Sequence, residues 1–377
     1  MNSIIIKRKI LSVAVDARPL AYGMTGNSRY LSKVLEFFGK WDDCYEILLL
    51  SHKNIHPVFF HLQNLPSIKT VSLNSKIPGP IWLHTEFPYL ARKLNAKILW
   101  GTLQLLPFAG KFCTNIVNFH DLNVISAPQT MARWNYFQHK IFVRRTLNVA
   151  DKVLCLSKNT MNDISLFQPI ARDKLALVYP GVETISDLAT LPKDSGKWGK
   201  FLFTLGTLEP RKNLKTLLNA FLKLKVNNPN YPYSLVIAGR AGWGESAQEL
   251  YAKLKLGEWE KDSVFFLENP DESTLAGLYK NCQAFLFPSI HEGFGLPLLE
   301  AMREKKICIA SDIPVFSEIL DAKQDFLVPP MKEESWIQAL VQFANMKLTS
   351  KIWDSKEWTW KGTAEKIARE IDQCVQS

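Results

Sequence analysis

The sequence predicts two α/β domains in succession, each with a mostly parallel sheet covered by helices. Short apolar runs of strand length alternate with stretches of helical periodicity, which is the pattern of repeated βαβ units. The alternation occurs twice, and a polar segment separates the two cycles. With 377 residues, of which 47% are hydrophobic, the chain is long enough for each half to bury its own core.

The first domain is predicted to span residues 1–187. It is expected to begin with a buried strand at residues 10–15, which ends at Asp16 and is followed by a loop up to residue 28 and a helix over 29–38. Later apolar runs predict strands at residues 46–50, 97–100, 114–119 and 152–156, and helices at residues 132–149 and 159–167.

The second domain is predicted to span residues 201–352, after a linker at 188–200 that is rich in turn-forming and polar residues. Its strands are expected at residues 201–205, 233–238, 263–267, 284–287 and 307–310. A final segment, 353–377, is rich in tryptophan and ends in a predicted helix. Such bulky side chains need a covering surface, so we expect this helix to dock back on the rest of the chain.

The net charge of the chain is +10, and all of it lies in the first half. Residues 1–187 hold 22 Lys+Arg and 12 Asp+Glu, whereas residues 188–377 hold 24 of each. The excess has two interpretations, a solvated basic surface or attraction to a phosphate-bearing acceptor or an anionic membrane. The basic residues are scattered and no nucleic-acid motif accompanies them, so no nucleic-acid partner is expected.

The cysteine pattern and the hydropathy indicate a cytoplasmic protein. None of the six cysteines lies in a C-x-x-C motif, and no paired histidines have zinc-site spacing, so free thiols in a reducing compartment are expected. No apolar run approaches the roughly 18 residues of a membrane span. Any membrane contact is therefore expected to be peripheral, at the inner face of the membrane.

The strongest motif is the segment FPSIHEGFGLPLLEAM at 287–302, which is predicted to form a strand, a glycine turn and a helix. Such a turn presents free backbone N–H groups at a helix N-terminus, where a diphosphate would fit. Glu300 could accept hydrogen bonds from ribose hydroxyls. The alternative is a plain strand–turn–helix. The candidate residues of this motif are Glu292, Gly293, Phe294, Gly295, Leu296 and Glu300.

Two further glycine-containing turns follow predicted strands of the second domain. In GTLEPRKN, which begins at Gly206, the cations Arg211 and Lys212 could hold a diphosphate and stabilise charge on a leaving group. The alternative there is a solvated basic turn before a helix. The other turn contains Gly239 and Arg240 and is a weak signal by itself.

Taken together, these motifs resemble the retaining glycosyltransferase family 4, which has the GT-B fold. The resemblance implies two Rossmann-like domains with parallel sheets facing a central cleft, and a C-terminal helix that returns to the N-terminal domain. It extends to the first half through residues 16–19, an acceptor-side loop and the HDL segment that begins at His120. The implied acceptor-side residues are Thr25, Gly26, Asn27 and Arg29.

The resemblance also implies roles for the motif residues. Arg211 and Lys212 would bind the donor diphosphate, Glu300 the ribose, and Glu292 with the backbone of 293–296 the transferred sugar and the phosphates. His120 would lie beside the reacting sugar. Members of the family often have glycine where this chain has Ser28. Whether the backbone of this loop can be approached as closely as in those members is therefore an open question.

The predicted function is transfer of a hexose, with mannose from GDP-mannose as the expected donor, to a glycan or lipid-linked glycan in surface polysaccharide assembly. The alternatives are a UDP-glucose-type hexosyltransferase, a sugar-nucleotide epimerase and a non-catalytic sugar-nucleotide binder. A dehydrogenase or an NTPase is not expected because G-x-G-x-x-G after the first strand and the P-loop motif are absent. No Asp-x-Asp occurs, so neither a metal nor a cofactor is expected.

Overall fold

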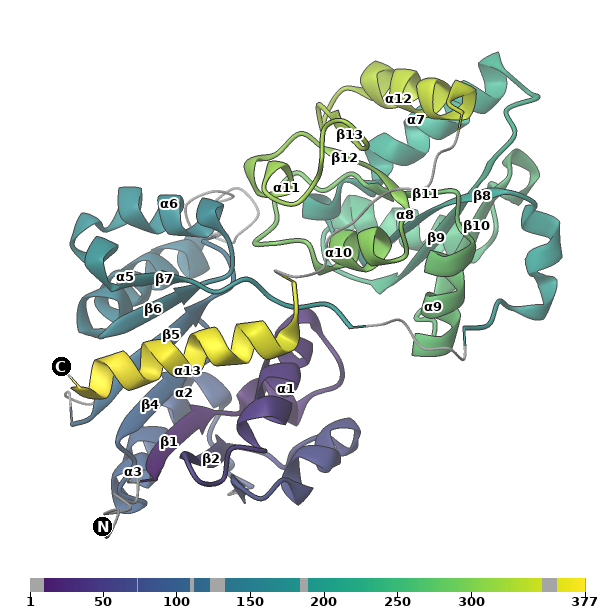
Figure 1. Ribbon diagram of the computed structural model, residues 1–377. Coiled ribbons are helices and arrows are strands. Elements are labelled where there is room, and N and C mark those ends of the chain that lie inside the picture. Colours follow the sequence, from purple (N-terminus) through teal and green to yellow (C-terminus); the bar gives the residue numbers. More distant parts are fainter. Residues whose placement is uncertain are drawn as a thin grey trace, which may run out of the picture. The chain divides into compact units, whose positions relative to one another are not determined.

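The computed structural model describes residues 10–72, 74–108, 112–122, 133–183, 189–347 and 358–376, with the backbone alone at 133–139 and 376 (Figure 1). The chain divides into two compact units. Unit 1 comprises residues 1–181 together with 356–377, and unit 2 comprises residues 182–355. Each unit contains one parallel sheet and is described by itself.

The sheet of unit 1 has the strand order β3-β2-β1-β4-β5-β6-β7, and all its pairings are parallel. The first strand is buried from Val13 to Asp16, with Leu11, Val13 and Val15 on one of its faces. The strands are β1 (Leu11–Asp16), β2 (Tyr45–Ser51), β3 (Ile68–Ser72), β4 (Ile98–Gly101), β5 (Thr114–Phe119), β6 (Lys152–Cys155) and β7 (Leu175–Leu177). The helices are α1 (Gly26–Phe38), α2 (Gly79–His84), α3 (Glu86–Lys93), α5 (Arg133–Val149) and α6 (Lys158–Phe167).

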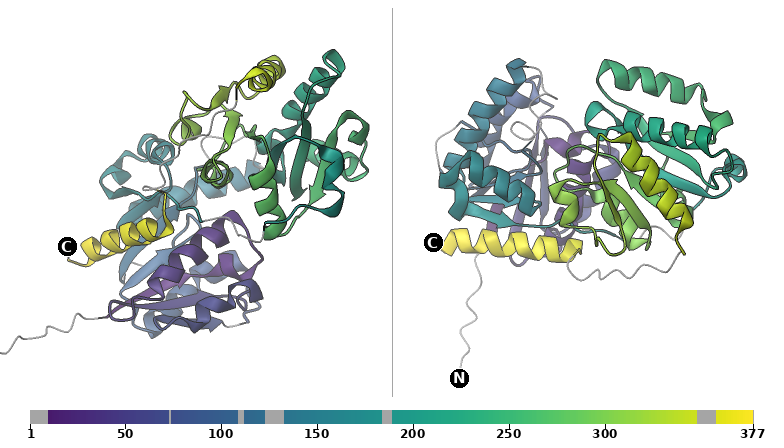
Figure 2. Two further views of the ribbon diagram at one scale, coloured as in Figure 1. Left: turned by 45° about the vertical axis from the view of Figure 1, so that its right-hand side comes forward. Right: turned by 90° about the horizontal axis from the view of Figure 1, so that it is seen from above.

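The last helix, α13 (Trp360–Gln376), belongs to unit 1 although it follows unit 2 in the sequence. It packs against α1 and also contacts β5 and β6 (Figure 2). Asp372 accepts a hydrogen bond from the Tyr45 hydroxyl at 2.9 Å. The backbone of Trp360 passes so close to Gly181 that a Cβ there would lie 2.1 Å from the Trp360 nitrogen. The predicted return of this helix to the first domain is therefore confirmed.

The sheet of unit 2 has the order β10-β9-β8-β11-β12-β13 and is also parallel throughout. Its strands are β8 (Phe201–Leu208), β9 (Ser234–Ala241), β10 (Val264–Glu268), β11 (Ala284–Phe287), β12 (Ile307–Ser311) and β13 (Phe326–Val328). Its helices are α7 (Leu214–Asn227), α8 (Glu245–Lys255), α9 (Glu272–Asn281), α10 (Leu296–Arg303), α11 (Pro314–Ser317) and α12 (Glu333–Asn345). The fold class predicted from the sequence, two α/β domains with parallel sheets, is confirmed.

Some predicted boundaries differ from those of the structure. The chain passes from unit 1 to unit 2 after Gly181, and residues 189–200 pack on unit 2. Within that stretch, Trp198 is buried and its carbonyl accepts a 2.7 Å hydrogen bond from the Ser234 hydroxyl. Residues 184–188 and Trp353 lie outside the described residues. The predicted linker at 188–200 thus contains residues that are part of the second unit.

All six cysteines are free thiols, as expected. Among the described residues, no helix is both long and apolar enough to cross a membrane.

Candidate active site

The two strongest sequence motifs of unit 2 meet where β8 and β11 lie side by side. From β8, the chain continues to β9 on one side, whereas β11 and the strands after it lie on the other side. Such a reversal of strand order creates a crevice at the carboxyl ends of the two strands, and ligands of open α/β sheets bind there. The loops after β8 and β11 carry most of the predicted donor-binding residues.

The turn after β8 is held against the loop after β11 by backbone and side-chain contacts. Asn213 adopts a left-handed conformation with φ of 51°, and its side-chain amide donates to the carbonyls of Pro288 and Pro330. The backbone nitrogen of Ile290 donates to the Arg211 carbonyl at 2.9 Å. These contacts fix the short 3₁₀ turn Pro210–Lys212 and with it the two cations of the site.

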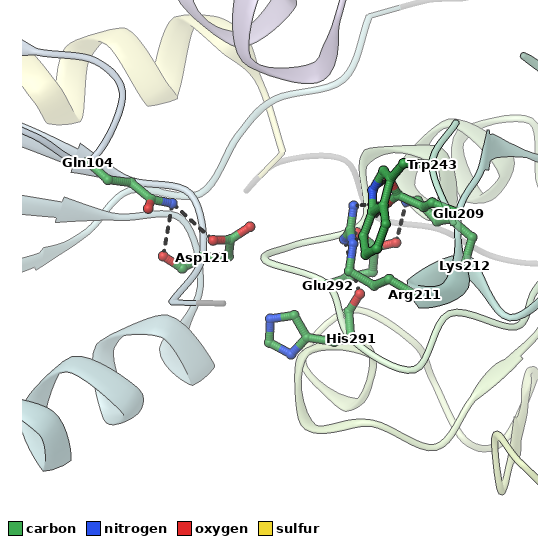
Figure 3. A network of polar contacts seen from close by, with 8 residues as sticks. All are labelled: Gln104, Asp121, Glu209, Arg211, Lys212, Trp243, His291 and Glu292. Carbon is green, nitrogen blue, oxygen red and sulfur yellow. Dashed lines mark hydrogen bonds and ion pairs between the residues drawn. The ribbon is translucent and has the colours of Figure 1, made fainter. Parts of the chain in front are cut away.

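Glu292 accepts hydrogen bonds from both predicted cations (Figure 3). Arg211 Nη1 lies 2.9 Å from Glu292 Oε2, and Lys212 Nζ donates to Oε1. Burial of Glu292 favours its neutral form, but Lys212 and Arg211 outweigh this effect and lower the pKa of the carboxyl to about 2. Lys212 Nζ also lies 5.2 Å from the centre of the Phe287 ring. The carboxylate is therefore ionised and holds both cations in place at neutral pH.

Glu209 and Trp243 belong to the same network, although the motif analysis assigned neither a role. Glu209 Oε1 accepts from Arg211 Nε at 3.0 Å and from Nη2 at 2.7 Å, and Oε2 accepts from the Trp243 indole at 3.0 Å (Figure 3). Glu209 belongs to the GTLEPRKN segment, and Trp243 lies three residues after Arg240. The spacing Glu209-x-Arg211 is a signal for the ion pair, but the contact with Trp243 depends on neighbouring strands.

The glycine turn before α10 has the geometry that its sequence predicts. Gly295 has φ of 112°, which disfavours any residue with a Cβ, and Phe294 beside it is buried. The helix begins at Leu296 and places Glu300 in its second turn. The Tyr279 hydroxyl donates to Glu300 Oε2 at 2.8 Å. Glu300 therefore already has one hydrogen-bond partner from α9.

Gly206 and Gly239 lie opposite each other on the neighbouring strands β8 and β9, and Gly239 allows their close approach. A Cβ at Gly239 would lie 2.2 Å from the Gly206 carbonyl oxygen, so no side chain fits there. Arg240 follows and is exposed. A cavity of about 10 Å³ lies between the ends of β8 and β11, lined by Gly206, Lys212 and neighbouring residues. This is the space of about one water molecule.

In unit 1, the predicted acceptor-side residues form the start of α1 rather than a loop. Thr25 is the N-cap, and Gly26, Asn27 and Arg29 lie in the first turn. The Thr25 hydroxyl accepts from the Ser28 nitrogen at 3.3 Å, and the Ser28 hydroxyl accepts from the Thr25 nitrogen at 2.8 Å. This reciprocal pair is a capping box. Ser28 therefore caps the N-terminus of α1 together with Thr25.

His120 follows β5 and packs against the same helix. Its Nε2 lies 3.0 Å from the Thr102 carbonyl oxygen, and because that oxygen only accepts, Nε2 carries the proton. Burial lowers the pKa of His120, although the Thr102 carbonyl and Asp121 act in the opposite direction. The Tyr30 ring of α1 meets the imidazole edge-on at 5.3 Å. His120 is therefore neutral, with Nδ1 as an acceptor.

The structure thus brings the predicted residues together in two sets, one in each unit. The set in unit 2 is a charged network around Arg211, and the set in unit 1 joins the start of α1 to His120 through Tyr30. Asp121, next to His120, accepts a 2.9 Å hydrogen bond from the Gln104 amide (Figure 3). Within the described residues, His, Cys, Asp and Glu side chains do not gather in a group able to hold a metal ion.

The chain is similar in sequence to known glycosyltransferases. Residues 191–357 match the family model of glycosyl transferases group 1. The chain is 26% identical over 278 residues to the O-antigen chain mannosyltransferase RfbU of Salmonella typhimurium, covering 72% of this chain and 73% of RfbU. It is also 26% identical over 332 residues to the serotype-specific mannosyltransferase WbdA of Escherichia coli, covering 79% of this chain but 39% of WbdA.

Solved structures show the same fold at low sequence identity. Anabaena HepE, in complex with UDP and glucose, matches with a TM-score of 0.64 at 17% identity, covering 98% of this chain and 100% of HepE. WaaG, a glycosyltransferase involved in lipopolysaccharide biosynthesis, matches with a TM-score of 0.67 at 14% identity, covering 96% of this chain and 95% of WaaG. Unit 2 therefore carries a group 1 glycosyltransferase domain, and the protein is a glycosyltransferase with the GT-B fold.

Proposed function

We propose that the protein transfers mannose from GDP-mannose to a glycan or lipid-linked glycan during surface polysaccharide assembly, with retention of anomeric configuration. The names of the relatives support the sugar and the process, because RfbU and WbdA are mannosyltransferases, the former of the O-antigen chain. Another relative, from Komagataeibacter xylinus, is a GDP-mannose:cellobiosyl-diphosphopolyprenol alpha-mannosyltransferase, 25% identical over 57% of this chain. Its name combines the proposed donor with a lipid-linked acceptor.

The observation that carries the proposal is the pair of cations held on Glu292 at the carboxyl edge of the sheet. Arg211 and Lys212 are fixed before any ligand binds, since Glu292 and Glu209 hold them with charge-assisted hydrogen bonds. A nucleoside diphosphate is the leaving group of the proposed reaction, and negative charge grows on it in the transition state. Cations that need no rearrangement stabilise such charge efficiently.

We propose a front-side substitution for the chemical step. The bond between the sugar C1 and the diphosphate oxygen breaks, and a bond from C1 to the acceptor hydroxyl oxygen forms on the same face. The departing phosphate oxygen takes the acceptor proton, so no second carboxylate is needed as a nucleophile. Arg211 and Lys212 would stabilise the leaving diphosphate and Glu300 would hold the ribose. Neutral His120 could accept a hydrogen bond from the transferred sugar at Nδ1.

We further propose that unit 1 makes a peripheral contact with an anionic membrane surface. Arg144 of α5 and Lys93 of α3 are exposed cations of this unit. Arg145 is a weaker candidate, because its guanidinium already donates to the carbonyls of Pro107 and Phe108. Lys7, Arg8 and Lys9 also contribute to the positive charge of the first half of the sequence, but they lie outside the described residues.

A panel of nucleotide-sugars tests the proposed donor. A ligand at 100 times its dissociation constant adds about 2.7 kcal/mol to stability, or roughly 5–10 °C in the melting temperature of a domain of this size. We expect GDP-mannose to give this shift and UDP-glucose to give none. A rise in melting temperature with UDP-glucose alone would show that the donor is UDP-glucose and not GDP-mannose. No rise with any nucleotide-sugar would contradict the proposal. Nuclear magnetic resonance of the product then establishes whether the anomeric configuration is retained.

A further inference from the structure

Trp243 is a large aromatic residue that the fold leaves half exposed at the ligand-binding edge of unit 2. It follows β9 and its side chain is 45% exposed, whereas Trp82, Trp100 and Trp336 are fully buried. Its indole N–H is already bonded to Glu209. The surface that remains open is therefore the apolar face and edge of the ring, which is suited to contact with another ring.

The loop around Trp243 is held tightly by two glycines. A Cβ at Gly242 would lie 2.2 Å from the Leu208 carbonyl oxygen, and a Cβ at Gly244, whose φ is +93°, would lie 2.8 Å from Pro210. Both distances show that the loop packs closely against the segment that leads from β8 to Arg211. The backbone on both sides of Trp243 therefore lies against this segment, and the hydrogen bond to Glu209 orients the indole toward Arg211.

Glu209 joins the ring to the cation through a single carboxylate. Oε1 receives two of the Arg211 N–H groups and Oε2 receives the indole N–H. The Glu209 side chain is 12% exposed and that of Arg211 is 20% exposed, so both are largely withdrawn from water. Hydrogen bonds run without a break from Trp243 through Glu209 and Arg211 to Glu292 (Figure 3).

We infer that Trp243 is a donor-binding residue whose ring stacks on a ring of the nucleotide-sugar, and that Glu209 is the positioning residue that orients both this ring and the Arg211 guanidinium. The inference rests on the proposed donor site at Arg211. A diphosphate bound there carries a nucleoside at one end and a hexose at the other, and each offers a ring face. One stacked base commonly contributes a factor of about ten to a hundred in affinity.

Calorimetric titration of the full-length protein with GDP and with GDP-mannose tests the ring contact. We expect W243A to weaken GDP-mannose binding at least about tenfold and W243F, which keeps a ring, to weaken it less than about threefold. An equal loss for GDP assigns the stacking to the base, and an unchanged affinity for GDP assigns it to the hexose. W259F, a change at another tryptophan of unit 2, is the matched control and should bind as the unaltered protein does.

Spectroscopy tests the positioning role without any ligand. In protein labelled with nitrogen-15 in its 11 tryptophans, W243F identifies the Trp243 indole resonance by its loss. E209Q keeps an acceptor for the indole but removes the charge, so we expect this resonance to move while the other indoles stay. E268Q, at an exposed carboxylate of β10, is the control. In kinetics, E209Q should lower kcat as well as affinity, because Arg211 loses its orienting partner.

Binding by the unaltered protein tests the proposed donor, and the variants test this inference. A W243A protein that binds GDP-mannose and GDP as tightly as the unaltered protein would overturn the ring contact, and so would a W243F protein that loses as much affinity as W243A. An indole resonance that does not respond to E209Q would overturn the positioning role, whichever nucleotide-sugar binds.

Discussion

Replacing Glu292 by glutamine removes the charge that holds Arg211 and Lys212 while keeping the shape of the side chain. The carboxyl titrates at a pKa of about 2 instead of 4.5, so at 1.36 kcal/mol per unit the folded protein favours its ionised form by ~3 kcal/mol. The cation side chains are 20% and 17% exposed, so water compensates part of the loss. We therefore expect E292Q to lower the free energy of unfolding at pH 7 by about 2 kcal/mol.

The pH dependence separates this charge effect from a packing effect. A carboxyl whose pKa is lowered on folding stabilises the protein above its unfolded pKa, and this stability is lost as the pH falls from about 4.5 toward 2. Between pH 7 and pH 4, the unaltered protein should lose about 1 kcal/mol of stability through protonation of unfolded Glu292, a loss that E292Q cannot show. The difference between the two proteins should therefore narrow to about 1 kcal/mol at pH 4.

Urea unfolding of both proteins at the two pH values measures this difference. Glu333 provides a matched control, because it also pairs with a lysine, Lys223, but at the surface. E333Q should change the unfolding free energy much less than E292Q at pH 7. A gap between the unaltered protein and E292Q that is as wide at pH 4 as at pH 7 would refute the electrostatic reasoning.

Four further predictions concern other parts of the molecule. Lys212→Ala should lower kcat by about 10²–10³, since charge on the leaving diphosphate grows in the transition state. The unaltered protein should stay active when a chelator removes divalent metal ions. Glu300→Ala should weaken binding of GDP-mannose, measured by calorimetry, while the melting temperature changes little. Gly181→Ala should destabilise unit 1 by about 1–3 kcal/mol, because its Cβ would meet the Trp360 backbone. The full-length protein should co-sediment with anionic vesicles at low salt and less at high salt, and Arg144→Glu should weaken this binding.

Each of these predictions has an outcome that contradicts it. Strict dependence of the activity on a divalent metal would refute the proposal that Arg211 and Lys212 take the place of a metal ion. Unchanged affinity of Glu300→Ala for GDP-mannose would remove Glu300 from the site. Gly196 is the control for Gly181, because nothing lies within 4 Å of a Cβ there and its substitution should be neutral. A protein that stays in the supernatant with anionic vesicles at low salt would show that the positive charge of unit 1 is only a solvated surface.

The sequence predicts the central strands of both sheets because each is an apolar run bounded by polar or turn-forming residues. Three edge strands, β3, β7 and β13, escape prediction. Two of them have only three residues, and β3 reads IKTVS, which mixes polar and apolar side chains. Strands at sheet edges are commonly short and polar, so they leave little periodicity to detect.

For the candidate site, the sequence places Arg211, Lys212 and Glu292 after the ends of two predicted strands, and the structure shows that these strands are neighbours. The contact between Glu209 and Trp243 could not be predicted, since it depends on the parallel register of β8 and β9 rather than on sequence spacing. The interpretation of Ser28 also changes with the structure. Its effect depends on the Thr25 side chain three residues earlier, and that pair is a recognisable capping signal.

The return of α13 to unit 1 has a consequence for the order in which the protein is completed during synthesis. Domains generally fold as units as the chain emerges, the N-terminal one first. Here the surface of unit 1 that receives α13 remains uncovered while all of unit 2 is being made. The helix that fills it buries Ala364, Ile367 and Ile371 completely. The unit that is synthesised first is therefore finished last, and until then its apolar surface is open to chaperones or to neighbouring chains.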